Sequence, residues 1–172
     1  IQNGQPIAIE IGNGQTSGSK LMVGQGELNE TLTNRGLKVE ASAPIFCNAR
    51  YRSSWQAEAL TSKGAKAQGQ TFRLGGMPIT YQGGIRSFVF GIMATEDNVQ
   101  VQISGYDNDV VFAGIPAVND DFLAFMLNDG ECRVYSAYAD SEANLAGVLG
   151  ALVQSSGNVV INVGNWCGSV GT

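Results

Sequence analysis

Apolar and polar residues alternate along several short stretches of this chain, and such alternation is typical of strands with one buried face. The clearest case is Asn98–Ser104, where Val99, Val101 and Ile103 occupy one face and two glutamines the other. Similar stretches rich in Val, Ile, Phe or Tyr predict strands at Pro6–Ile11, Leu37–Ala41, Ile45–Tyr51, Ser87–Ala94, Val110–Ala113, Asp121–Leu127, Cys132–Tyr138 and Asn158–Val163. Short strands at this spacing predict an all-β protein.

Glycine-rich turns separate these stretches, as at Gly83-Gly84 and Asn128-Asp129-Gly130. The chain holds 23 glycines but only 4 prolines, which fits many short elements joined by tight turns. We therefore expect an antiparallel β-sandwich, with jelly-roll-like and immunoglobulin-like folds as alternatives. A length of 172 residues is enough for one domain, so we expect residues 1–172 to form a single sandwich.

One segment, Ser141–Gln154, departs from the alternation. Leu145, Val148, Leu149 and Leu152 follow helical spacing. Gly147 and Gly150 oppose a helix there, each by about 1 kcal/mol. Periodicity by itself favours a helix in this segment.

Composition and charge narrow the classes of function. The chain has no histidine, which excludes His-dependent triads and the common His-containing zinc sites within this chain. Its ten acidic residues from Glu96 onward face a single base, Arg133, so the net charge of −5 is unevenly distributed. Such a surface does not suit nucleic-acid binding, and no apolar run is long enough to span a bilayer.

Three cysteines, Cys47, Cys132 and Cys167, lie far apart, without the spacing of metal or redox motifs. They are either buried thiols or contribute one disulfide in an exported protein. If a disulfide forms, we expect Cys132 to pair with Cys167, which closes a loop of modest length.

Acidic residues gather in turns between the predicted strands, and they are the candidate ligand-binding residues. Asp107-Asn108-Asp109 is the best local cluster of oxygen ligands for calcium, although it lacks the spacing of an EF-hand loop. Asp120 and Asp121 form a second acidic turn. The alternative is that these acids only solvate turns and keep sheet edges from pairing. The aromatic residues Trp55, Tyr51 and Tyr106 are candidate stacking platforms for sugars.

Four segments in order resemble one known family. They are Gly36–Ile45, Phe90–Ile103 with its Ala-Thr-Glu-Asp-Asn run, Gly150–Ile161, and Gly164-Asn-Trp-Cys-Gly168. Together they resemble the IgGFc-binding-protein-like amino-terminal domain, which is found in mucus-type secreted proteins and in bacterial surface proteins of the gliding-adhesin type. The resemblance implies a β-rich extracellular module, and it implies a strand at Gly147–Gln154.

The resemblance also implies a function. We expect a non-catalytic binding or structural module of a secreted or cell-surface adhesin, cut from a larger exported protein. It would bind an extracellular protein or glycan, or neighbouring domains of its own chain, without nucleic acid, membrane insertion or a cofactor other than calcium. The alternatives are a carbohydrate-binding module and a glycan-active enzyme that uses two facing carboxylates.

Overall fold

The structure, a computed structural model, describes residues 4–12, 21–52, 57–80, 82–83, 86–115 and 122–166. It is an all-β protein with 39% of its residues in strands, which confirms the predicted class. All strand pairs in the described residues are antiparallel. In chain order the elements are η1 (Gln25–Glu27), β1 (Asn48–Arg52), β2 (Ala57–Thr61), η2 (Gly64–Ala67), β3 (Gly69–Arg73), β4 (Ser87–Ala94), β5 (Val99–Ser104), β6 (Phe122–Leu127), β7 (Cys132–Tyr138), α1 (Ala143–Ala146) and β8 (Leu152–Trp166).

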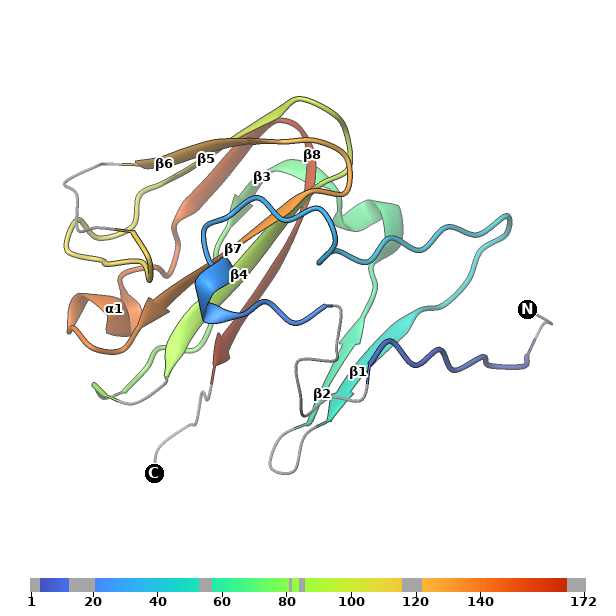
Figure 1. Ribbon diagram of the computed structural model, residues 1–172, viewed down its shortest axis with the longest axis horizontal. Helices are drawn as coiled ribbons and strands as arrows, with labels where there is room; N and C mark the ends of the chain where they lie inside the picture. Colours follow the sequence, from blue (N-terminus) through green and yellow to red (C-terminus); the bar gives the residue numbers. More distant parts are fainter. Residues whose placement is uncertain are drawn as a thin grey trace.

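One long strand, β8, joins the two layers of the sandwich. Its first half lies between β3 and β5, and β6 pairs with the far side of β5. Its second half pairs with β4, which in turn pairs with β7. Figure 1 shows β8 curving from the β5 layer into the β4 layer. The two layers are therefore parts of one curled sheet, and β1 and β2 form a separate hairpin.

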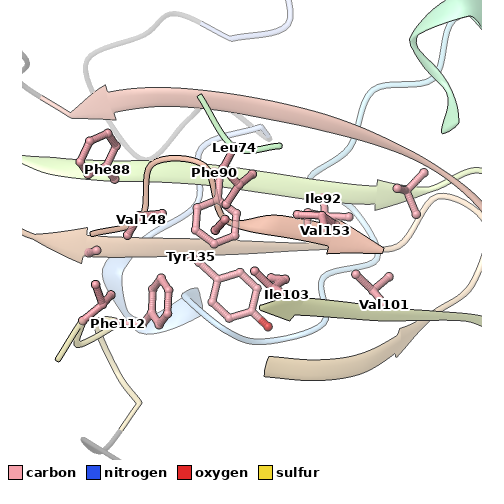
Figure 2. Close-up of a cluster of buried hydrophobic side chains, with 14 of the residues drawn as sticks. Leu74, Phe88, Phe90, Ile92, Val101, Ile103, Phe112, Tyr135, Val148 and Val153 are labelled. Atoms are coloured by element: carbon pink, nitrogen blue, oxygen red, sulfur yellow. The ribbon is translucent and has the colours of Figure 1, made fainter. Parts of the chain in front are cut away.

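The core lies between the two layers, and the alternating residues build it. Val99, Val101 and Ile103 of β5 are buried, as the sequence predicted, and the intervening glutamines are exposed. Aromatic rings fill the middle: Phe90 of β4 stacks on Tyr135 of β7 with ring centroids 5.3 Å apart. Figure 2 shows these side chains converging from β4, β5, β7 and β8. Burial of this apolar surface is the main stabilising contribution to the fold.

Several predicted strands are wrong. Among the described residues, 6–11, 37–41 and 110–113 are extended or turn segments that pair with no strand. Alternation at 6–11 and 37–41 does not bury the apolar residues, since Ile9 is 81% exposed and Val39 54%. In contrast, β4 and β7 match their predicted bounds. The sequence analysis missed β2 and β3, because their sequences, AEALT and GQTFR, show little regular alternation and few β-branched or aromatic residues.

The segment that begins at Ser141 contains both a helix and a strand. Helix α1 lasts only for Ala143–Ala146, and residues 147–150 form turns. Gly150 has a φ of +81°, a left-handed conformation that ends the helical stretch, and β8 begins at Leu152. The strand predicted over 147–154 is therefore wrong for its first five residues.

The Ala-Thr-Glu-Asp-Asn segment ends β4 and forms the turn to β5, and it bonds to β8 and to the turn that follows β6. The Thr95 amide donates to the Asn158 carbonyl, and the Asn158 amide donates to Glu96 Oε1. Asp97 Oδ1 accepts from the amide of Asp129 at 3.1 Å. Asn98 adopts a φ of 57°, a conformation that asparagine tolerates better than most residues. Glu96 and Asp97 therefore have a structural role at this end of the sandwich.

Candidate functional site

A hollow opens at the end of the sandwich near α1, at the opposite end of β5 from the Ala-Thr-Glu-Asp-Asn turn. It has a volume of about 640 Å³ and is lined by Tyr106, Asp107, Asn108, Asp109, Glu142 and Ala143. Two loops form it: the one that leaves β5 and the one that joins β7 to α1. Asp107 and Asp109, predicted from the sequence, thus lie together with Tyr106, which was predicted separately.

The first loop is held in place by its own backbone and by the core. The Asp107 amide donates to the Gly147 carbonyl at 2.9 Å, and the Val110 amide donates back to the Asp107 carbonyl at 2.9 Å. Beyond them, the ring of Phe112 is buried and meets the ring of Tyr106 edge to face, with centroids 5.2 Å apart. The loop is therefore anchored at both ends of its acidic turn.

A buried amide side chain, Asn144 of α1, connects the two loops. Its Oδ1 accepts from the Val111 amide at 3.0 Å, and its Nδ2 donates to the carbonyls of Val111 and Tyr138 at 3.0 and 2.6 Å. The Asn144 Nδ2 atom also lies 3.4 Å from Asp140 Oδ1, a longer contact than the other two. Because Asn144 is fully buried, these bonds are protected from water and fix the relative position of the loops.

Close packing at Gly147 completes the wall behind the hollow. A β-carbon at this position would lie 2.6 Å from Val110 Cγ2 and 3.0 Å from Asp107 Cβ. No side chain fits there without moving the acidic turn. Gly147 is a glycine because of this close approach, since its backbone is in the ordinary helical region.

The hollow is strongly acidic. Asp107, Asp109 and Glu142 are exposed on its rim, and the ion pairs found in the described residues all lie elsewhere. Unpaired carboxylates attract cationic groups and accept hydrogen bonds from hydroxyl and amide donors. The site can thus bind a ligand that offers several donors.

Metal binding at this turn stays a prediction. In the part of the chain that the structure describes, no three Asp, Glu, Cys or His side chains are grouped closely enough to hold a metal ion. Asp107 and Asp109 would need oxygen ligands from other sources, since calcium takes six to eight. Calcium at Asp107, Asn108 and Asp109 therefore rests on the sequence pattern.

Other candidate site residues lie outside the described residues: Trp55, Asp120, Asp121 and Cys167. Tyr51 belongs to β1, away from the hollow, and is 41% exposed. Glu142 was noted only as one of many acids in turns, and Asn144 was missed. The signal for Asn144 is a polar residue among the helically spaced leucines of its segment.

Cys132, one cysteine of the predicted disulfide, is a buried free thiol at the start of β7. Burial raises the pKa of this thiol above its ordinary value, and nearby Arg35 partly offsets the increase. Its predicted partner, Cys167, lies outside the described residues, so the Cys132–Cys167 disulfide stays a prediction.

No protein-family model matches this chain, no curated protein matches its sequence and no solved structure matches its fold. The family resemblance therefore rests on the four sequence segments. None of the helices in the described residues is long and apolar enough to cross a membrane.

Proposed function

We propose that this chain is a non-catalytic binding module of an extracellular, adhesin-like protein, and that it binds its ligand in the acidic hollow. One observation carries the proposal: Asn144 and Gly147 fix the two loops that carry an aromatic ring and three carboxylates around an open hollow. Rigid strands that present polar loops at one end are a common arrangement for recognition.

The favoured ligand is a glycan. Sugar hydroxyl groups donate to carboxylate and amide oxygens, which Asp107, Asn108, Asp109 and Glu142 supply, and the ring of Tyr106 lines the same hollow. Ligand sites commonly combine an apolar ring with a few convergent polar groups in this way. Extracellular location and adhesion are supported by the sequence resemblance and by a glycine-rich β fold.

A glycan array probed with the full chain tests this function, followed by calorimetric titration of the best ligands. Asp109→Asn and Glu142→Gln should each weaken binding at least tenfold, about 1.4 kcal/mol, because each removes a charged acceptor from the hollow. The matched control is Asp129→Asn, an exposed acid beyond the opposite end of β5. Unchanged affinity in both hollow variants would contradict this site, and release of cleaved sugar would show an enzyme instead.

A further inference from the structure

Strand β6 is a sheet edge of unusual composition. Its sequence is Phe-Leu-Ala-Phe-Met-Leu, without a charged residue or proline, and β5 is its only strand neighbour in the described part of the chain. Natural edge strands are normally protected by lysine, proline, a bulge or a covering segment, because an apolar edge pairs with other chains. β6 has none of the first three, so a covering segment is needed.

The free edge presents the backbone of alternate residues. The Gln100 amide donates to Ser156 Oγ of β8. The backbone amide and carbonyl groups of Gln100, and of Gln102 and Ser104 at alternate positions, therefore point toward β8. Val99, Val101 and Ile103 therefore direct theirs toward β6, where they meet Leu127, Phe125 and Leu123. The amides and carbonyls of Phe122, Ala124 and Met126 must then point away from β5. These six backbone groups have no protein partner in the described residues.

The two faces of this edge are also incompletely covered. On the core side, Leu123 and Phe125 are only partly buried, and the Arg133 guanidinium lies 4.8 Å from the ring centroid of Phe125. On the outer side, Phe122 and Met126 are 49% and 52% exposed. An added strand would cover apolar surface on both faces.

The chain itself carries a segment with the required properties. Residues 6–11 are extended and pair with no strand among the described residues. Ile7, Ile9 and Ile11 share one face and are 59%, 81% and 39% exposed, whereas Ala8 and Glu10 occupy the other face. This is the pattern of a half-buried strand, and its six residues equal the length of β6.

We propose that residues 6–11 of one copy add as a strand to the free edge of β6 in a second copy. The three isoleucines extend the core side beyond Leu123 and Phe125, and Glu10 faces solvent. Pro6 stands at the first position of the added strand, where a missing amide is tolerated. Strand addition of this kind gains affinity from main-chain hydrogen bonds and specificity from alternate side chains.

The occupant is a second copy because both halves of the contact are unsatisfied in the same chain. One such contact covers on the order of 600 Å² in total, which is small for a stable interface. Two reciprocal contacts about a twofold axis cover about 1,200 Å², which reaches the lower limit of specific interfaces. The expected species is therefore a dimer with exchanged strands.

Sedimentation equilibrium of the full chain over a range of concentrations tests the proposal. We expect a reversible dimer whose dissociation constant rises at least tenfold in Ile9→Asp. Because the Ile9 side chain is exposed in the monomer, this substitution should leave the fold of the monomer unchanged. Ala124→Pro should weaken the dimer in the same way, because it removes an outward amide. The matched control is Val39→Asp, at another exposed β-branched position outside the segment, which should leave the dimer intact.

Amide hydrogen exchange gives a readout that does not depend on a variant. Exchange at Phe122, Ala124 and Met126 should slow with rising protein concentration, while the neighbouring β5 amides stay unchanged. A chain that is monomeric at every concentration, or a dimer unaffected by Ile9→Asp, would overturn the proposal. Exchange at these three amides that does not depend on concentration would also overturn the proposal, even if the chain forms a dimer through another surface.

Discussion

At the scale of single residues, Asn144 has the largest influence on the candidate site. Its side chain is fully buried and bonds two backbone groups of Val111 and one of Tyr138. Asn144→Ala leaves these partly buried groups without partners and opens a gap at a fully buried position, so we expect a loss of about 2–4 kcal/mol in the free energy of unfolding. Urea unfolding followed by circular dichroism measures it. The exposed Asn108→Ala should change stability by less than about 0.5 kcal/mol, and equal losses in both would contradict the role given to Asn144.

The cysteines give a second prediction at this scale. Cys47 is partly exposed, whereas Cys132 is buried and its thiol pKa is raised. Since the thiolate is the reactive form, Cys47 should react with a thiol reagent well before Cys132 in the folded chain. Mass spectrometry of timed labelling identifies the modified residue.

Counting thiols in denaturant then tests the disulfide. If the predicted Cys132–Cys167 bridge forms, the unreduced, unfolded chain should show one reactive thiol out of three cysteines. Three reactive thiols would show that no disulfide forms and would contradict the predicted pair.

At the scale of elements, the alternation along β5 makes a direct test of register possible. Val101 is 2% exposed, whereas the next residue, Gln102, faces solvent on the same strand. Val101→Asp buries an unpaired charge and should cost several kcal/mol, enough to unfold a marginal domain. Gln102→Asp is the matched control and should melt within a few degrees of the parent. Similar melting of the two variants would show that the strand faces are assigned wrongly.

The elements also show what the sequence could and could not predict. β4 and β5 were predictable because one face of each is buried, so alternation and burial nearly coincide. Burial along β7 does not alternate, and this strand was predictable from its content of Val and Tyr residues. Residues 6–11 alternate just as clearly but pair with no strand that the structure describes. Alternation shows that a segment is able to form a half-buried strand, and a neighbouring strand must be present as well. Asp107 and Asp109 line the same hollow as Glu142, although more than 30 residues of sequence separate them. The topology of the sheet brings them together, and no local sequence pattern shows this.

At the scale of the whole molecule, burial is distributed very unevenly along the chain. In the part of the chain that the structure describes, the buried residues all lie from Leu74 to Val159, and none before Leu74 is buried. The earlier part touches the sandwich through a few hydrogen bonds, such as those between Leu32 and Cys132, and through β3. Most of the fold's stability must therefore come from β4 to β8.

Limited proteolysis with trypsin tests this distribution. Arg50, Lys63 and Lys66 lie in or beside the β1–β2 hairpin, and a two-stranded hairpin alone is marginally stable in water. Local opening should expose these bonds easily, so we expect early cuts there. Arg133 lies within β7, where its bond becomes accessible only when the curled sheet unfolds. A fragment containing β4 to β8 should therefore persist on a gel while the hairpin is lost. If cleavage at Arg133 kept pace with cleavage at Arg50, the hairpin would share the cooperative unfolding of the sandwich.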